Sequence, residues 1–384
     1  MIRPDARLVA RIDLDRLAAN WDALNTLSGQ AECAAVIKAN AYGHGVREIA
    51  LTLVHAGCRM FFTAGYEEAS ELREILDPVL PDAIIAVFDG ITGHDREAVL
   101  NRAIIPTINS LHDLGLFARW AGEAGTPLPA MLQLDTGMNR LGAGADELGR
   151  IVNSPDFGAA DWRLVFSHLA SADEPDNPQN PRQKTAFDAM RATLPGIAAN
   201  TPASIAATGG IMLGEGFHYQ VTRPGIGLYG LSPVPAFSDH LQPVISLHAR
   251  VLQIRDANPG ETVGYNATAT LTRPSRLATI AGGYADGVRR HLSNKGHAFR
   301  NGLSAPIIGR VSMDTVVIDI TDWPDNNLTP NNLSPGDYVE LIHDGYDADA
   351  MAAQSGTIGY DILTGLGLRA TPHYDGDIMN RIHF

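Results

Sequence analysis

The sequence contains only two cysteines among 384 residues, Cys33 and Cys58, and both lie in apolar stretches. So few cysteines cannot form a disulfide framework or a cysteine-based zinc site, which favours a reducing compartment. Basic residues are also scarce, with 29 Lys and Arg against 43 Asp and Glu and no basic run. The net charge of -14 argues against nucleic acid or an anionic membrane as a partner, because binding either needs clustered positive charge.

Long apolar runs are missing as well. The first twenty residues interleave arginine and aspartate, which leaves no apolar core for a signal peptide. The longest uncharged window, residues 192–214, contains prolines and glycines and lacks the sustained apolarity of a membrane span. We therefore expect a cytoplasmic protein. A hydrophobic content of 45% supports a full globular core, and the length favours two domains.

Over the first 235 residues, short β-rich runs alternate with segments of helical periodicity. Eight runs are candidate strands: Ala34–Ile37, Met60–Thr63, Ile84–Phe88, Ile104–Ile108, Met131–Leu134, Leu164–Phe166, Ser204–Ala207 and Tyr219–Thr222. Eight β/α units predict a closed parallel (β/α)8 barrel of the TIM type. A doubly wound open sheet is the alternative, which periodicity alone does not exclude.

After about Leu231 the pattern changes to closely spaced strands separated by Pro, Gly and Asn turns. This predicts a C-terminal, mainly-β domain, with the proline-bearing segment 232–235 as the junction. The predicted domains are therefore 1–235 and 236–384. The sequence leaves open whether residues near the N-terminus pair with the second domain.

Lys38 ends an apolar run and stands immediately before a glycine-bounded turn that also carries Tyr42 and His44. A desolvated lysine amine loses its charge readily and can form a Schiff base with an aldehyde. The plainer interpretation is a lysine that leaves its strand for solvent. We favour chemistry, because active sites of such barrels form at the carboxyl ends of the strands.

Other polar residues follow later strands: Arg140, His168, Thr208 and Arg223. Residues 225–230 match G-x-G-x-x-G, but the two prolines at 233 and 235 oppose the helix that a dinucleotide site needs. The same glycines suit a single phosphate after strands seven and eight, with Thr208 adding a hydroxyl. A reactive lysine, one phosphate site and a nearby arginine together indicate pyridoxal phosphate.

At this point the chain resembles the alanine racemase family along essentially its whole length. The motifs that carry the resemblance are residues 35–45, 135–142, 166–173, 222–230, 264–265, 282–290, 309–314 and 356–369. The resemblance implies a pyridoxal-phosphate barrel joined to a β domain, working as a head-to-tail homodimer. It implies interconversion of L-alanine and D-alanine, supplying D-alanine for cell-wall peptidoglycan.

The resemblance also assigns residues. Lys38 matches the Schiff-base lysine, and Tyr265, from the partner subunit, matches the opposing base of a two-base mechanism. Arg140 and the backbone N–H of Met313 match the groups that bind the substrate carboxylate. The remaining cofactor-binding positions are Tyr42, His168, Thr208, Arg223, Gly225, Ile226 and Tyr360. Arg223 would face the pyridine nitrogen and, as a donor only, leave that nitrogen unprotonated.

Two departures from the family pattern stand out. Many relatives carry a carbamylated lysine where this chain has Gln133, and the family usually has Asn-Ser where this chain has Ala207-Thr208. The alternatives kept open are a racemase of another amino acid, a fold-related pyridoxal-phosphate decarboxylase and a noncatalytic carrier of the cofactor. Against the decarboxylase, Arg223 stands where an acidic partner of the pyridine nitrogen is expected. Against the carrier, the second domain would have no evident use.

Overall fold

The computed structural model describes residues 6–92, 95–324, 333–367 and 369–379. The chain divides into two compact units. The barrel unit comprises Arg16–Ala41 and Val46–Gln242, and the β unit comprises the segment up to Asp15, Tyr42–Gly45 and the chain from Pro243 on. The predicted division into 1–235 and 236–384 is continuous in sequence. In the structure two short segments that precede residue 46 belong to the β unit, and the barrel unit extends to Gln242.

The strands of the barrel unit are parallel and form a ring. They are β2 (Glu32–Cys33), β3 (Ala35–Val36), β4 (Met60–Thr63), β5 (Ile84–Val87), β6 (Ile104–Ile105), β7 (Thr107–Ile108), β8 (Leu128–Gln133), β9 (Ala160–Phe166), β10 (Ala203–Ser204) and β11 (Val221–Thr222). The pairings run β3-β4-β5-β6, β7-β8-β9-β10 and β11-β2. Single residues, Ala34 and Pro106, interrupt two of the eight strand positions. A bridge between Ala207 and Arg223 joins β10 to β11, so the predicted (β/α)8 barrel is confirmed and the open sheet is excluded.

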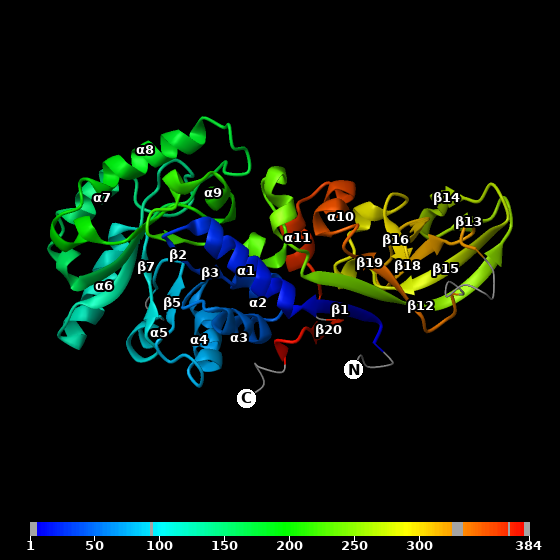
Figure 1. Cartoon of the computed structure of the whole chain (residues 1–384), viewed down its shortest axis with the longest axis horizontal. Helices are drawn as coiled ribbons and strands as arrows, with labels where there is room; N and C mark the ends of the chain where they lie inside the picture. Colours follow the sequence, from blue (N-terminus) through cyan, green and yellow to red (C-terminus); the bar gives the residue numbers. More distant parts are fainter. Residues whose placement is uncertain (1–5, 93–94, 325–332, 368, 380–384) are drawn as a thin grey trace. The chain divides into compact units, whose positions relative to one another are not determined.

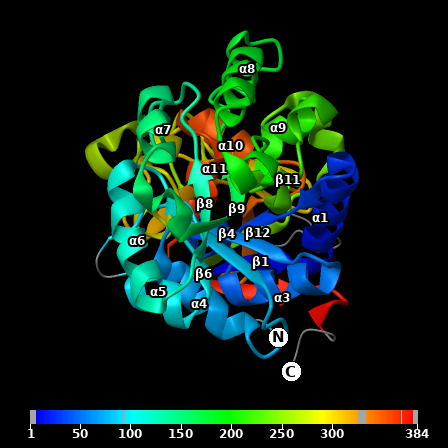
Figure 2. The ribbon, with the colours of Figure 1, turned by 90° about the vertical axis from the view of Figure 1, so that its left-hand side faces the viewer.

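Helices surround these strands, as Figure 2 shows for α3, α4, α5 and α6. The helices are α1 (Leu14–Ser28), α3 (Val46–Ala56), α4 (Tyr66–Leu76), α5 (Arg96–Asn101), α6 (Leu111–Ala124), α7 (Ala145–Val152), α8 (Gln179–Arg191) and α9 (Thr208–Met212). Helix α6 illustrates how local sequence sets the bounds: the Ser110 hydroxyl accepts from Asp113 N at 3.2 Å, and Gly125 ends the helix with φ 69°. Its buried Leu114 and Phe117 belong to the same apolar cluster as Val165 of β9.

The β unit is built on a sheet in the order β17-β16-β19-β12-β1-β20, with β15 and β18 continuing from β12 (Figure 1). Its strands are β1 (Leu8–Asp13), β12 (Ile245–Ala257), β13 (Thr262–Val263), β14 (Ala269–Thr270), β15 (Ser275–Ala281), β16 (His297–Arg300), β17 (Leu303–Pro306), β18 (Thr315–Asp319), β19 (Tyr338–Ile342) and β20 (Ala370–Asp375). Two helices, α10 (Ala348–Ser355) and α11 (Gly359–Thr364), complete it.

The N-terminal strand β1 settles a question that the sequence left open. It pairs antiparallel with β12 and parallel with β20, so it is a central strand of the β unit. The segment Tyr42–Gly45 also belongs there, because Tyr374 Oη donates to the His44 carbonyl at 3.0 Å. No helix of the described residues is long and apolar enough to cross a membrane.

Candidate active site

Lys38 follows β3 at the carboxyl end of the barrel, where the sequence predicted it. Its side chain is half-buried, with Nζ 5.8 Å from the ring centroid of Phe88. Burial lowers the pKa of the Lys38 amine, and the positive charge of Arg140 lowers it further, against smaller opposing effects of Glu68 and Asp89. Both effects make the neutral amine, which is the form that acts as a base or nucleophile, easier to reach than for a lysine in solvent.

A left-handed turn comes directly after this lysine in α2 (Lys38–Tyr42). Ala39, Asn40 and Ala41 have φ of 54°, 51° and 53° with ψ near 50°, and Tyr42 has φ 54°. Such a conformation costs roughly 1–2 kcal/mol for each non-glycine residue. Two side chains support it: Glu68 Oε1 accepts from Ala39 N at 2.6 Å, and Asn40 Oδ1 accepts from Val46 N at 2.8 Å. The backbone on the C-terminal side of Lys38 is thus held in a strained but well-defined path.

Arg223, after β11, is one of the largest fully buried side chains of the described residues. Its guanidinium donates to the Ser204 hydroxyl and, at 2.6 Å, to the Ser167 carbonyl, and Cζ lies 4.8 Å from the ring centroid of Phe166. Among the described residues no carboxylate pairs with it. Burial lowers the pKa of Arg223 to about 9, so it stays protonated at neutral pH. A buried cation with only neutral acceptors can serve a neutral acceptor such as a pyridine nitrogen.

His168 follows strand β9. Three positively charged side chains, Arg223, Arg140 and Lys38, act on its imidazole. Burial, then Arg223, Arg140 and Lys38, lower the pKa of His168 to about 3, which makes the imidazole neutral. Gln183 of α8 fixes this segment, because its Nε2 donates to the His168 carbonyl at 2.9 Å and its Oε1 accepts from Ala170 N at 2.8 Å.

Arg140 lies on a loop that Asp135 organises. Asp135 Oδ1 accepts from the backbone N–H groups of residues 137, 138 and 139 at 2.9, 2.9 and 3.1 Å. Arg140 is exposed, and no hydrogen bond or ion pair of its side chain occurs among the described residues. Its charge nevertheless lowers the pKa values of both Lys38 and His168, so the three groups share one site.

Gln133, the first of the two departures noted in the sequence, is 7% exposed and contacts the same loop at Leu141. Its Nε2 donates to the Leu141 carbonyl at 3.2 Å, while its buried Oε1 has no hydrogen-bond partner among the described residues. A buried amide oxygen without a donor is costly, by about 1–3 kcal/mol. Leu141, the neighbour of Arg140, thus holds the Gln133 amide nitrogen, while the amide oxygen can still accept a hydrogen bond.

The predicted phosphate site combines Thr208 with the turn at 225–227. Thr208 is 3% exposed, and its hydroxyl accepts from Gly225 N at 3.1 Å and Gly227 N at 3.2 Å. A Cβ at Gly227 would lie 2.7 Å from Thr208 Cγ2, so a side chain has no room there. The N–H of Ile226, which begins a short 3-10 turn, has no partner among the described residues and can donate to an anion.

The sequence-based interpretation missed three phenylalanines beside Lys38 and Arg223. Phe62 stacks on Phe88 with centroids 5.1 Å apart, and Phe88 meets Phe166 edge-on at 6.0 Å. Lys38 and Arg223 stand over the last two of these rings. The sequence did show that Phe88 and Phe166 end their apolar runs at the carboxyl ends of strands. Phenylalanines of an ordinary core occur in the same pattern, so this did not identify them as site residues. Ser204 and Gln183 were also missed as supporting residues.

Four predicted residues belong to the β unit. Tyr265 and Met313 are strongly exposed, at 67% and 52%, and both lie outside regular strands. Tyr42 is buried and Tyr360 is partly exposed, with their rings 6.3 Å apart. The remaining predicted residues, Lys38, Arg140, His168, Thr208, Arg223, Gly225 and Ile226, all lie in the barrel unit.

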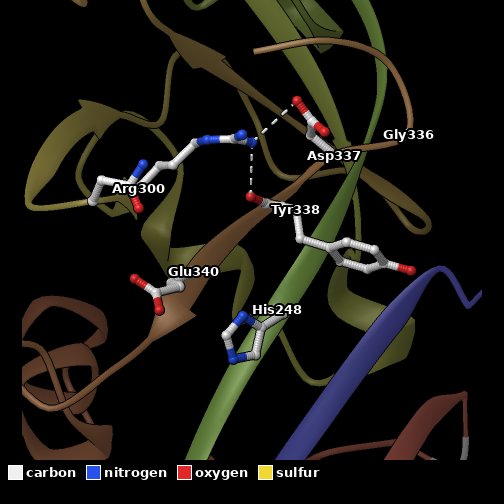
Figure 3. Close-up of a pocket in the computed structure, with 7 residues that line it drawn as sticks. His248, Arg300, Gly336, Asp337, Tyr338 and Glu340 are labelled. Carbon is white, nitrogen blue, oxygen red and sulfur yellow. Dashed lines mark hydrogen bonds and ion pairs between the residues drawn. The ribbon is translucent and has the colours of Figure 1, made fainter. Parts of the chain in front are cut away.

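A separate polar pocket in the β unit contains none of the predicted residues (Figure 3). Its volume is about 290 Å³, and it is lined by His248, Arg300, Asn301, Gly336, Asp337, Tyr338 and Glu340. Arg300 Nη1 is engaged with Asp337 Oδ2 and the Tyr338 carbonyl, each at 3.3 Å. The pocket holds none of the groups that the barrel brings together, so the candidate active site remains at the barrel.

Comparisons with known proteins point to one family. Residues 12–233 match the family described as "Alanine racemase, N-terminal domain" and residues 244–374 match "Alanine racemase, C-terminal domain". The chain is 44% identical over 361 residues to an alanine racemase of Acidiphilium cryptum, covering 93% of this chain and 96% of that protein. It is 41% identical over 375 residues to one of Brucella suis, covering 94% and 92%.

Solved structures agree. The fold is similar to alanine racemase from Bartonella henselae with covalently bound pyridoxal phosphate, with TM-score 0.88, 38% identity and coverage of 96% of this chain and 100% of that one. It is equally similar to alanine racemase from Streptomyces coelicolor A3(2), with TM-score 0.88, 30% identity and coverage of 97% and 99%. From these matches over almost its entire length, we conclude that the chain belongs to the alanine racemase family.

Proposed function

We propose that this protein interconverts L-alanine and D-alanine with pyridoxal 5'-phosphate as cofactor. The observation that carries the proposal is the barrel-end site itself, where a lysine with a lowered amine pKa shares the space with a neutral His168 and the cations Arg140 and Arg223. Members of the family provide the substrate class, and this site provides groups suited to proton transfer beside a bound carboxylate.

The residues present fit the cofactor. Lys38 would hold it through its amine, and the turn at Gly225 and Ile226 with the Thr208 hydroxyl would receive the phosphate. Tyr42 and Tyr360 would add to the phosphate site. The buried Arg223, which can only donate, would face the ring nitrogen, and His168 would lie beside it. When bound, pyridoxal phosphate supplies an electron-accepting ring that stabilises the charge left when the α-proton departs.

The protein would contribute two bases. The Lys38 amine, whose pKa burial and the charge of Arg140 lower, takes the α-proton of the D-substrate at Nζ. The Tyr265 side-chain oxygen takes that of the L-substrate, and each group returns its proton in the reverse direction. Arg140 binds the substrate carboxylate together with the backbone N–H of Met313, which orients the α-carbon between the bases.

The working form would be a homodimer in which each site uses Tyr265 and Met313 of the partner subunit. Both side chains are strongly exposed in the β unit, so they are accessible to a partner subunit. The two cysteines are free and buried, which agrees with a cytoplasmic enzyme. We further propose that the product D-alanine is used for cell-wall peptidoglycan.

The test is to incubate the purified protein with pyridoxal phosphate and L-alanine and to follow the enantiomer ratio by chiral chromatography, with Lys38→Ala as the control. We expect approach to an equal mixture, lost in the control. Formation of ethylamine and carbon dioxide would instead identify a decarboxylase. Cofactor binding without any turnover would identify a carrier, and either result would overturn the proposal.

A further inference from the structure

The turn at residues 282–287 of the β unit is hydrogen-bonded to the segment 312–314, which carries Met313. Tyr284 N donates to the Ser312 carbonyl at 3.0 Å, Ala285 N to the Met313 carbonyl at 3.1 Å, and Gly282 N to the Asp314 carbonyl at 3.1 Å. The backbone is therefore fixed on both sides of Met313. The N–H of Met313 itself has no hydrogen-bond partner among the described residues.

One arginine ties this turn to the same segment. Arg369 Nε and Nη2 reach Asp286 Oδ1 and Oδ2, each at 2.8 Å, and Nη1 reaches Asp314 Oδ1 at 2.7 Å. Asp286 is 4% exposed, and its Oδ2 also accepts from Gly283 N at 2.8 Å. A bidentate arginine–carboxylate pair fixes direction as well as distance. The guanidinium thus spans the turn and the residue that follows Met313.

The turn and the segment are also in backbone contact. A Cβ placed on Gly283 would overlap with the carbonyl groups of Ser312 and Met313. The φ of Gly283 is −152°, an extended value that any residue adopts, so close approach alone requires glycine there. Because no side chain separates the two backbones, a shift of the turn has to shift Met313.

We propose that Arg369, through Asp286 and Asp314, is a positioning residue that aims the Met313 N–H at the carboxylate of the substrate. This inference rests on the proposed function, in which that N–H binds the carboxylate in the partner's site. Charge supports it as well. Without Arg369, two aspartates close to Met313 would lose their counter-ion and would repel an incoming carboxylate.

The test uses Arg369→Gln, which removes the positive charge, and Arg369→Lys, which keeps the charge but cannot bind both oxygens of Asp286 with two nitrogens. Arg273→Gln is the matched control, since Arg273 makes a similar two-nitrogen pair with Asp322 at 2.8 and 2.6 Å, in the same unit but on exposed side chains. Arg369 is half-exposed, so its replacement leaves no buried cavity. The measured quantities are KM and kcat for both enantiomers, and the inhibition constants of propanoate and ethylamine.

We expect Arg369→Gln to raise KM for L-alanine and D-alanine, and the inhibition constant of propanoate, by the same factor of roughly ten or more. Arg369→Lys should give a smaller increase. Ethylamine has no carboxylate, so its inhibition constant should stay unchanged, and Arg273→Gln should resemble the wild type. Calorimetric binding of propanoate to the holoenzyme gives the same comparison without turnover.

Two results would overturn the inference: unchanged propanoate affinity in Arg369→Gln, or an equal loss for propanoate and ethylamine, which would indicate general damage to the site. Asp286→Asn gives a second variant, expected to weaken propanoate binding while removing only one carboxylate. If the wild type itself does not racemise alanine, the proposed function has failed. If the wild type racemises and the variants bind propanoate normally, only this inference has failed.

Discussion

At the residue scale, the neutral state of His168 makes stability depend on pH. The folded chain keeps this imidazole unprotonated down to about pH 3, whereas the unfolded chain protonates it near its ordinary value of 6.5. Between those values the unfolded state binds more protons, so stability is full above about pH 6.5 and is lost as the pH falls. We expect His168→Gln to flatten the acid side of a plot of urea midpoint against pH.

His248 of the β unit provides a comparison, because burial, followed by the charge of Arg11, lowers its pKa to about 4. His248→Gln should flatten the same plot over a narrower window and leave racemisation unchanged. A His168→Gln profile identical to that of the wild type would contradict the neutral imidazole.

Gln133 leads to a second prediction at this scale. Its amide cannot be carbamylated, so activity should be the same in buffer with and without carbon dioxide. Gln133→Leu removes the hydrogen bond from Nε2 to the Leu141 carbonyl, next to Arg140, and should raise KM for alanine several-fold, as expected for about 1 kcal/mol. Gln133→Lys should gain a dependence on added bicarbonate. An unchanged KM in Gln133→Leu would show that the position of Arg140 does not depend on this hydrogen bond.

The residue types and their spacing were enough to place Lys38, Arg140, His168, Thr208 and Arg223 at strand ends, because β/α alternation fixes where polar residues emerge. The roles of these residues remain predictions. Phe88 and Gln183 could not be recognised in advance, since their contacts join segments far apart in sequence. The same aromatic and amide side chains occur in any core or helix face.

At the scale of elements, the turn after Lys38 stores backbone strain without any glycine at its left-handed positions. Ala39 is exposed, so Ala39→Gly removes no packing and should stabilise the fold by roughly 1 kcal/mol. The control is Ala189→Gly, at an exposed position inside the right-handed helix α8, where glycine should destabilise by about 0.5–1 kcal/mol. Chemical denaturation of both variants measures the difference. Destabilisation by Ala39→Gly would contradict the strain.

Helices and strands were predicted with unequal success. Met60–Thr63 was predicted with the observed bounds, because its apolar run and the neighbouring turns define it. The strands β1 and β20 were not predicted as a pair, since their partnership joins the two ends of the described chain. The left-handed turn was also missed, because nothing in the Ala-Asn-Ala-Tyr sequence requires positive φ.

At the scale of the whole molecule, the proposed homodimer with shared active sites predicts complementation between inactive variants. Lys38→Ala and Tyr265→Phe should each be inactive as homodimers. In a mixed dimer, one site combines both changes and the other combines the intact Lys38 of one chain with the intact Tyr265 of its partner. Subunit exchange should therefore restore about a quarter of wild-type activity. No recovery, with mixed dimers confirmed by native mass spectrometry, would show that each site uses a single chain.

The position of β1 also bears on how the protein is made. This strand leaves the ribosome before any part of the barrel, yet its partners β12 and β20 follow the barrel in the chain. During synthesis β1 has no strand to pair with while the barrel residues are being added. The sheet is complete only after residues 370–375 have been added. Because domains generally fold as units during translation, the barrel can form first and the β unit last. A nascent chain stalled before β20 would then carry a folded barrel and a bare edge strand, a natural target for chaperones.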